Sequence, residues 1–414
     1  MHYNFYFDET FHDRKITISE NGTINALLED ADDSYIGVFI GFDNRYKCSF
    51  QRQFLKLESK YKTIYGIADE FKSTSIKRKN FVNGIKSFNE NAFNFYSDFF
   101  NMLSDENFIF HINILSKIEL FVRNLYPVTL LDKTIIPNKQ FYYSLTKYII
   151  TYNNTELIKK LFESIEENNI QIITQELIRQ INITIETIKN IERKTMEVPA
   201  LKELIIVLQS IDESTTVENK LDFVYSQNFE GLKLLMDERC ANVNKIDLII
   251  DREQKTYESA LGYNFNRVEE KDSKHQIFLR LVDHLCGFIG KMIYALHNDK
   301  QFKEDKVISI EKLKDNDIIR KHLISKEWFM LNEEQFKLYK KITKALVINQ
   351  YYYWSTMTWT YCDEIVMFYS LLNYINQYNE YKDFLAVNSE LHCEYYNGYV
   401  CSRLKEQYKK MYKY

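Results

Sequence analysis

Asp8 is the first residue of the chain whose type and position could support chemistry. It directly follows residues 2–7, HYNFYF, which alternate in the manner of a β-strand. The alternation places Asp8 on the face opposite Phe5 and Phe7, so its carboxylate is not expected among the phenylalanines. A strand end holds a carboxylate with little freedom to move, which suits metal binding. The alternative is an aspartate that only begins a turn.

Asp251 repeats this arrangement later in the chain. It ends the strand pattern of residues 243–250, VNKIDLII, and precedes the charged stretch 252–255. Two aspartates at strand ends are harder to dismiss as turn residues than one. Asp247 lies four residues earlier on the same strand face and is the competitor. We rank it lower because it lies in the middle of the strand and could pair with Lys245 or another surface base.

Asp283 lies on a predicted helix that spans residues 273–296 and has a clear apolar face. Gly287 and Gly290 fall on the same stripe of that helix as the aspartate. Glycine costs roughly 1 kcal/mol in a helix interior relative to alanine. Two glycines on one face therefore predict that another backbone or a ligand comes close beside Asp283. The alternative is a tightly packed helix in which Asp283 pairs with an arginine.

Glu70 and Lys72 belong to the motif EFK, which opens the basic, hydroxyl-rich segment KSTSIKRK at residues 72–79. An acid beside cations and hydroxyls is the combination that phosphate-backbone chemistry requires, because carboxylates bind a metal while cations and hydroxyls bind phosphates. Taken alone, the segment is also typical of a charged loop that faces solvent. Its position beside Glu70 favours the chemical interpretation.

A sheet interrupted by helices must position these residues. Extended patterns predict strands at residues 2–7, 14–19, 35–42, 108–115 and 243–250, the first two forming a hairpin. Helical periodicity predicts helices at residues 80–103, 155–165, 174–191 and 273–296. Strands alternating with helices indicate an α/β fold. Residues from about 116 to 240 carry almost no strand signal and are interpreted as a helical insertion, and residues 301–414 are again helical and rich in Tyr and Trp.

Composition limits the class of protein. The 414 residues include only 10 Gly and 3 Pro, which favours long helices. A net charge of −4 means that a nucleic acid would have to be bound by a local basic patch. The six cysteines show no CxxC spacing, which is typical of reduced thiols in the cytosol and argues against a zinc site. No signal peptide and no long apolar span are recognisable, so we expect a cytoplasmic protein that does not enter a membrane.

Several common chemistries lack their motifs in this sequence. We find no GxxxxGK[ST], GxGxxG, GxSxG or HExxH. These absences exclude the usual nucleotide-loop, dinucleotide, serine-hydrolase and zincin motifs. The acidic residues remain the best candidates for chemistry.

Four motifs, in this order along the chain, together resemble one known family. They are YFDET at residues 6–10, EFK at 70–72, LIID at 248–251 and LRLVDHLCG at 279–287. The pattern resembles bacterial proteins that carry the domain of unknown function 3800, which are regarded as ribonuclease-H-like. Val282 and His284 depart from the commonest form of the last motif, Leu-x-x-Ala-Asp. The resemblance covers residues 1–115 and 243–300 and leaves 116–242 and 301–414 unmatched.

The resemblance implies an α/β fold with a ribonuclease-H-like mixed sheet, whose core is formed by residues 1–115 and 243–300. Residues 116–242 would then be a large helical insertion, and residues 301–414 a helical C-terminal region. It further implies that four acids converge at one end of the sheet: Asp8, Glu70, Asp251 and Asp283. Four carboxylates cannot stay ionised together without a cation, and hard oxygen ligands favour Mg²⁺ or Mn²⁺ over zinc.

The function that follows from the resemblance is a metal-dependent nuclease that hydrolyses phosphodiesters of DNA or RNA. Lys72 would hold the scissile phosphate, and Glu9 is an alternative ligand. A role in defence against phages or mobile elements is expected by family analogy alone. The rival is a non-catalytic binding or scaffold protein that keeps the fold and forms a homodimer or partner interface through its helical regions. Exposed aromatic side chains would favour that rival.

Overall fold

The computed structural model describes most of the chain, and the structural statements below concern the described residues. These are residues 2–10, 34–131, 137–152, 157, 159–160, 170–191, 194–195, 197–211, 226–299, 324–350 and 360–411. The predicted strand at residues 14–19 lies outside them, as does most of the helix predicted at 155–165. Residues 351–354 and 359, part of the Tyr- and Trp-rich C-terminal region, also lie outside them.

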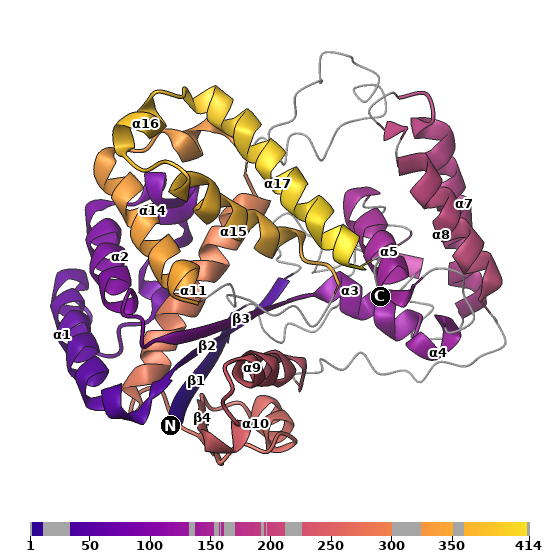
Figure 1. The fold of residues 1–414 in the computed structure, drawn as a ribbon. Helices are drawn as coiled ribbons and strands as arrows, with labels where there is room; N and C mark the ends of the chain where they lie inside the picture. The colour runs from indigo at the N-terminus through magenta and orange to yellow at the C-terminus, as the bar shows by residue number, and fades with distance from the viewer. Residues whose placement is uncertain are drawn as a thin grey trace.

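A five-stranded mixed sheet organises the fold (Figure 1). Its strand order is β3-β2-β1-β4-β5. The antiparallel pairs are β1–β2 and β2–β3, and the parallel pairs are β1–β4 and β4–β5. The strands are β1 (Tyr3–Thr10), β2 (Ser34–Asp43), β3 (Ile109–Ser116), β4 (Ile246–Ile250) and β5 (Arg267–Glu270). The predicted mixed α/β class is therefore confirmed, and strands from both parts of the predicted core lie in one sheet.

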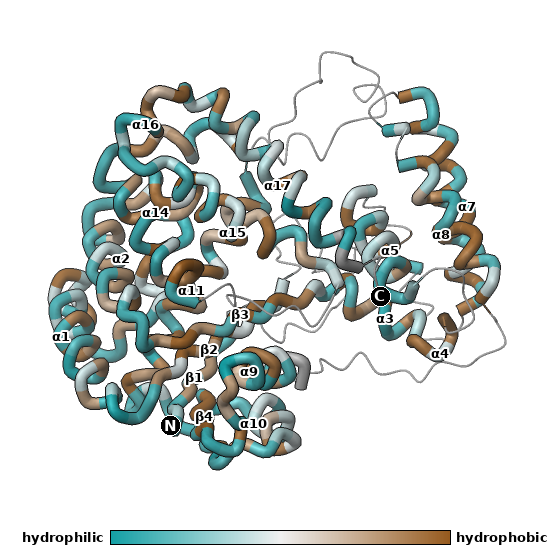
Figure 2. Tube along the Cα trace, in the orientation of Figure 1, coloured by the Kyte–Doolittle hydropathy of each residue, from teal (hydrophilic) through white to brown (hydrophobic). Residues whose placement is uncertain are grey.

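One face of the sheet packs against the main hydrophobic core. Figure 2 shows hydrophobic residues concentrated on the central strands. Their side chains on this face, such as Tyr6 and Val38, belong to one hydrophobic cluster with three helices: α1 (Lys47–Tyr65), α2 (Glu90–Leu103) and α11 (Ile277–His297). Helix α1 ends at Gly66, whose φ of 64° is the left-handed conformation that glycine adopts without strain. This turn directs the chain toward Glu70.

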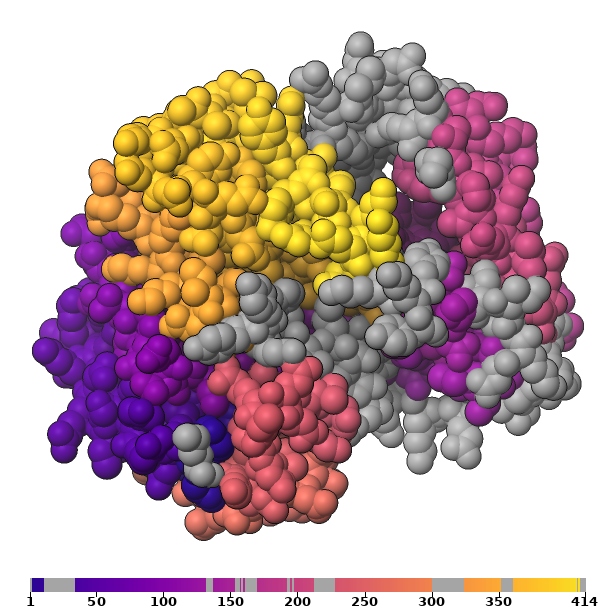
Figure 3. Space-filling model, in the orientation of Figure 1, coloured from indigo at the N-terminus to yellow at the C-terminus, as the bar shows by residue number. Residues whose placement is uncertain are grey.

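The C-terminal helices extend the same core. Their buried residues, such as Phe336 and Phe368, belong to one hydrophobic cluster with α2 and α11. In Figure 3 the orange and yellow C-terminal helices lie directly against the purple N-terminal part. These helices are α14 (Glu333–Leu346), α15 (Asp363–Asn376), α16 (Tyr381–Leu385) and α17 (Ser389–Met411). The C-terminal region is thus packed as part of the core.

The opposite face of the sheet is covered by α9 (Ser226–Glu238) and α10 (Gln254–Leu261). Phe5 and Phe7 of β1 pack there with Phe229 of α9. Tyr6 lies on the other face, so the alternation predicted for the first strand is confirmed. Helix α9 lies within the predicted insertion but packs directly on the sheet.

The rest of the insertion forms a second hydrophobic core at the right of Figure 1. Its helices are α3 (Lys117–Leu125), α4 (Val128–Leu131), α5 (Asn138–Tyr152), α7 (Ile170–Ile188) and α8 (Glu197–Ser210). Buried Glu119 of α3 joins this unit to the C-terminal region. Its carboxylate accepts hydrogen bonds from the backbone N–H groups of Thr360 at 2.8 Å and Tyr361 at 2.6 Å.

Short 3-10 turns connect many of these elements. They are η1 (Asn44–Tyr46), η2 (Ser73–Ser75), η3 (Arg78–Phe81), η4 (Gly84–Ser87), η6 (Val243–Lys245), η7 (Lys326–Phe329) and η8 (Ile348–Gln350). Three of them occupy the interval between α1 and α2, so the helix predicted from residue 80 in fact begins at Glu90, capped by Asn89. Helix α1 and strand β5 were not predicted from the sequence. No helix among the described residues has the length and apolar character needed to cross a bilayer.

Candidate active site

Asp8 and Asp251 occupy matched positions on adjacent parallel strands. The last paired residues of the β1–β4 ladder are Phe7 and Ile250, and each aspartate is the next residue of its chain segment. Strand β1 continues beyond Asp8 to Thr10, and on its β2 side Asp8 lies opposite Val38. The prediction that Asp8 ends its strand is therefore wrong for the β2 side and correct for the β4 side. Asp251 follows directly after β4, as predicted.

Asp283 reaches the same region from the second turn of α11, which packs on the face of the sheet that carries Tyr6. The nearby acids affect the pKa of the Asp8 carboxyl group. Burial of the Asp8 carboxyl group raises its pKa well above 3.8, and the charges of Asp283 and Asp251 raise it further. The backbone N–H of Glu9 and the charge of Lys72 lower it in part. The charges of Asp283 and Asp251 thus both act on the Asp8 carboxyl group.

Asp283 also holds the segment that carries Glu70 and Lys72. Its two carboxylate oxygens accept hydrogen bonds from the backbone N–H of Ser73 at 2.7 Å and from the Ser73 hydroxyl at 2.8 Å. Gly287 makes this contact possible, because a Cβ atom there would lie 2.4 Å from both Cβ and Oγ of Ser73. The predicted close approach beside Asp283 is confirmed at Gly287.

Two further side chains of α11 hold the same segment. Lys291 donates a hydrogen bond from Nζ to the Ser73 carbonyl oxygen at 2.6 Å, and Nε2 of His284 lies 2.9 Å from the Phe71 carbonyl oxygen. Burial lowers the pKa of Lys291 to about 8 and that of His284 to about 4. His284 is therefore neutral at physiological pH and serves in packing.

Glu70 is linked to the aspartates through Lys72. The Lys72 ammonium lies 3.1 Å from the Glu70 carboxylate. Partial burial alone would lower the pKa of Lys72, but the bond to Glu70 and the charges of Asp283 and Asp251 raise it. Lys72 is therefore a permanent cation beside the acids. The hydroxyl of buried Ser273 donates a long hydrogen bond of 3.4 Å to Glu70.

Arg280, the arginine of α11, binds groups other than Asp283. Arg280 binds Glu58 of α1 through two hydrogen bonds of 2.5 and 3.0 Å. It also donates to the Ser273 carbonyl oxygen at 2.6 Å. The alternative in which an arginine neutralises Asp283 is therefore wrong for Arg280. Arg280 instead joins α11 to Glu58 of α1 and to the turn that precedes α11.

Two acids considered as competitors lie elsewhere. Asp247 accepts hydrogen bonds from His2 at 2.8 Å and Asn266 at 2.7 Å, near the beginning of β4. Glu9 points to the other face of the sheet, where it accepts a hydrogen bond from the Tyr35 hydroxyl at 2.6 Å. The sheet therefore separates Glu9 from the face that carries Asp8, and Glu9 is a poor alternative ligand.

The side chains of the acidic site offer the type of ligand atom that a hard divalent cation prefers. These atoms are carboxylate oxygens, which Mg²⁺ and Mn²⁺ prefer. Each oxygen of Asp283 accepts one hydrogen bond and keeps a lone pair for a cation. Among the described residues, however, no three His, Cys, Asp or Glu side chains are close enough together to hold an ion. The carboxylates would have to move together when a metal binds.

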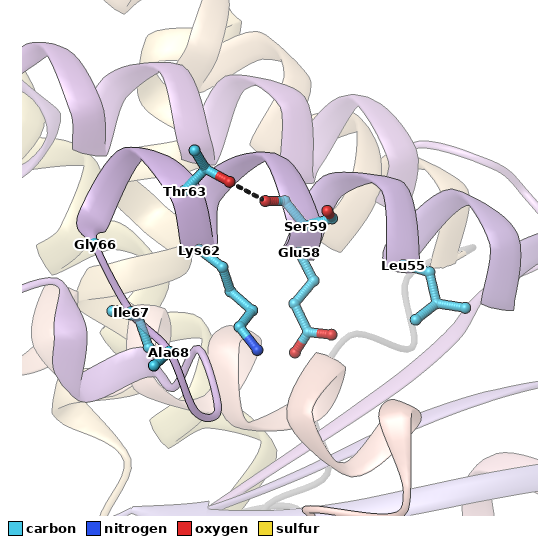
Figure 4. A pocket seen from close by; sticks show the side chains of 8 residues that line it. All are labelled: Leu55, Glu58, Ser59, Lys62, Thr63, Gly66, Ile67 and Ala68. Carbon is cyan, nitrogen blue, oxygen red and sulfur yellow. Dashed lines mark hydrogen bonds between the residues drawn. The ribbon is translucent and has the colours of Figure 1, made fainter.

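A shallow hollow of about 550 Å³ lies beside α1 rather than over the acids. Figure 4 shows Glu58 and Lys62 of α1 projecting from the same side of the helix, with Ile67 and Ala68 in the turn beyond Gly66. The Glu58 carboxylate is already bound to Arg280. The hollow therefore provides no acidic group for catalysis.

Sequence reasoning missed Ser73 and Lys291 as parts of this region. Lys291 lies eight residues after Asp283, on the helix stripe that also contains Gly287. That spacing was the available signal. Ser73 has no comparable signal beyond its place in a hydroxyl-rich segment.

No family model, curated protein or solved structure matches the chain. The geometry of the acids and the resemblance of the four motifs remain as the indications of function.

Proposed function

We propose that the chain is a divalent-metal-dependent nuclease with a ribonuclease-H-like core. The observation that carries the proposal is the placement of Asp8 and Asp251 at matched positions on adjacent parallel strands, with Asp283 of α11 close enough to raise the pKa of Asp8. Perturbed carboxyl groups of this kind are enriched at catalytic sites. The five-stranded mixed sheet supports the fold part of the proposal.

Asp8, Asp251 and Asp283 would hold Mg²⁺ or Mn²⁺ together with Glu70. When bound, the cation would supply a Lewis acid that activates water and stabilises the leaving oxygen of a phosphodiester. The sheet and α11 would fix the backbone positions of three of these acids, and their side chains would turn toward the cation as it binds. Their mutual repulsion without a cation is the physical reason for them to take one up.

Lys72 would bind the phosphate that is cleaved. Its side chain is 46% exposed, so its ammonium group is accessible to a ligand. Its link to Glu70 keeps it beside the acids, and the contact between Ser73 and Asp283 fixes the backbone next to it. The Lys72 ammonium group is thus kept near Glu70 and Asp283 by these contacts.

The test is an assay with labelled DNA, RNA and hybrid substrates in Mg²⁺ or Mn²⁺. We expect Asp8→Asn combined with Asp251→Asn to abolish hydrolysis. The matched control is Asp247→Asn, which removes one carboxylate from the same strand but lies with His2 and Asn266. Equal hydrolysis by the wild-type protein and the Asp8, Asp251 double variant would refute the proposal.

The rival function is a non-catalytic binding or scaffold protein. The absence of a closed three-donor group among the described residues favours it. The aromatic side chains give it little support, because in the described part of the chain Tyr395 is the only large aromatic residue among the exposed hydrophobics. Nucleic-acid binding without hydrolysis in either metal would favour the rival. A cytoplasmic location, a defence role and a dimer stay proposals that derive from the expectations above.

A further inference from the structure

Helix α1 carries a strong positive charge in a chain whose net charge is −4. Its 19 residues include five Lys or Arg and one acid, Glu58. Arg280 of α11 binds the Glu58 carboxylate at 2.5 and 3.0 Å, so this acid does not offset the cations of its own helix. One of the five cations, Lys60, is bound to Asp98 of α2 at 2.7 Å. The other four are not neutralised in this way.

Three of these cations lie on one side of α1. At 3.6 residues per turn, Arg52, Lys56 and Lys62 fall within an arc of about 120° around the helix axis. The opposite side carries Phe54 and Tyr61, which are buried in the core. None of the three cationic side chains makes a hydrogen bond or ion pair with a described residue. They are therefore free to bind an anion.

One of the three, Lys62, lines the hollow beside α1. The hollow is formed by residues of the helix, including Leu55 and Ser59, and by the turn at residues 66–68. Its only charged lining residues are Glu58, which is already neutralised, and Lys62, so its net charge is positive. The side chains of Leu55 and Lys62 lie on the same side of the helix (Figure 4), and Leu55 is 44% exposed. A cation, a hydroxyl and an apolar side chain together suit a strand that presents phosphates and bases.

The hollow adjoins the candidate active site. Ala68 lines the hollow and lies two residues before Glu70, so their Cα atoms are at most about 7 Å apart. The ammonium group of Lys72 lies 3.1 Å from the Glu70 carboxylate. Arg52 and Lys62 are ten residues apart, which is about 15 Å along the helix axis and matches roughly four nucleotides of a stacked strand. A ligand that contacts all three cations of α1 is therefore a polymer.

We propose that Arg52, Lys56 and Lys62 of α1 bind the phosphates of a nucleic-acid strand, and that the hollow leads this strand to the acidic site. The inference deepens the proposed function and rests on it for the identity of the polyanion. An acidic peptide would satisfy the same charges, but only a phosphodiester polymer also fits a cleavage site at Glu70 and Lys72. The contacts are made to backbone phosphates, so they carry no base specificity, and both DNA and RNA bind.

The test measures binding of fluorescein-labelled single-stranded DNA and RNA of about twelve nucleotides, long enough to span α1 and the hollow. Ca²⁺ replaces Mg²⁺, and fluorescence anisotropy is followed over a salt series. The variant combines Arg52→Gln, Lys56→Gln and Lys62→Gln. We expect weaker binding and a slope of log Kd against log salt reduced by about 2, because each neutralised phosphate of a single strand contributes about 0.7.

The matched control combines Lys202→Gln, Lys344→Gln and Lys405→Gln. It removes the same charge from exposed lysines of α8, α14 and α17, away from the hollow. We expect this control to keep the slope of the wild-type protein within about half a unit. A labelled peptide of about twelve glutamates, measured in the same way, tests the alternative polyanion.

The inference is overturned if the α1 variant and the control bind with the same slope, or if the wild-type protein binds neither oligonucleotide at low salt. A glutamate peptide that binds as tightly as the oligonucleotides through the same three cations would also overturn it. Hydrolysis that depends on Asp8, together with equal slopes, would leave the nuclease and remove the α1 surface. Slope loss in a protein that hydrolyses nothing would leave the α1 surface and remove the nuclease.

Discussion

Asp8 occupies a position that costs folding free energy when its carboxyl group is charged. Its pKa in the folded protein is raised above 3.8 by burial and by the nearby charges of Asp283 and Asp251. The folded state therefore binds the proton more tightly than the unfolded state does. The resulting stabilisation is fully present below the unfolded pKa and is lost as the pH rises through the folded pKa. At neutral pH this stabilisation is reduced or lost, so Asp8 makes the metal-free protein less stable there than at acidic pH.

We expect Asp8→Asn to raise the free energy of unfolding at neutral pH in EDTA, because the amide carries no charge to bury. The difference from the wild-type protein should disappear as the pH falls to about 4 and below. Urea denaturation at several pH values measures it. Adding Mn²⁺ should stabilise the wild-type protein and leave the variant unchanged.

Asp247→Asn is the control, because we expect it to change the free energy of unfolding in the opposite direction. Burial alone would raise the pKa of Asp247, but the hydrogen bonds from Asn266 and His2 lower it. Its charged form is therefore favoured in the folded state, and the variant should be less stable at neutral pH. A wild-type protein that is more stable than the Asp8 variant in EDTA would contradict the account of Asp8.

Some residues of the candidate site could be identified from the sequence, and others could not. Asp8, Asp251 and Asp283 were identified because each follows or interrupts a strong local pattern of apolar residues. The contacts of Ser73 with Asp283 join residues 210 positions apart, and no local pattern encodes such a contact. The alternation of the first strand correctly placed Asp8 on the face opposite Phe5 and Phe7, but only the register of β1 with β4 shows Asp8 next to Asp251.

At the scale of elements, α11 packs so closely against the segment around Ser73 that no additional atom fits between them. A Cβ atom at Gly287 would overlap Ser73, although alanine is otherwise favoured over glycine in a helix by about 1 kcal/mol. We expect Gly287→Ala to displace the segment, to lower the free energy of unfolding by roughly 1–3 kcal/mol, and to abolish hydrolysis. Urea denaturation and the nuclease assay measure the two effects.

Gly262→Ala provides the comparison. A Cβ atom there would meet only the Ser259 carbonyl oxygen, at 3.4 Å, and the backbone φ of −69° suits any residue. Its effect on stability should stay within about 0.5 kcal/mol. Equal effects of the two substitutions would show that the contact with Ser73 has no special role.

Elements were predictable where the hydrophobic pattern was strong. The patterns of β1, β4 and α11 are long or continuous, and all three were found within a few residues of their bounds. Strand β5, RVEE, is short and charged because it lies at the edge of the sheet, so it lacks the alternation of a half-buried strand. Helix α1 was missed because many polar residues interrupt its apolar stripe.

At the scale of the whole molecule, the core near the sheet depends on the C-terminal helices. Gln335 of α14 donates a hydrogen bond to the Ile85 carbonyl oxygen, and Phe336 and Phe368 pack into the same cluster as α2 and α11. A chain that ends after Asp299 would expose this cluster. We expect it to lose cooperative unfolding and to bind the dye ANS, as compact states with exposed apolar surface do.

Ending the chain after Lys405 is the matched control, because it removes only the end of α17, where Glu406 and Lys409 are exposed. That shorter protein should unfold cooperatively like the full chain. A cooperative transition in the protein that ends after Asp299 would contradict a shared core and would make the C-terminal region a separate domain.

The two borders of the sheet also bear on how copies of the protein meet one another. At β3 the side chain of buried Gln350 accepts a hydrogen bond from the Phe110 N–H at 3.0 Å and donates one to the Phe108 carbonyl oxygen at 3.3 Å. It thereby occupies backbone groups that a foreign strand would need. At β5 the charged residues Arg267, Glu269 and Glu270 discourage the same pairing. Both borders of the described sheet therefore carry features that oppose growth into aggregates by strand addition.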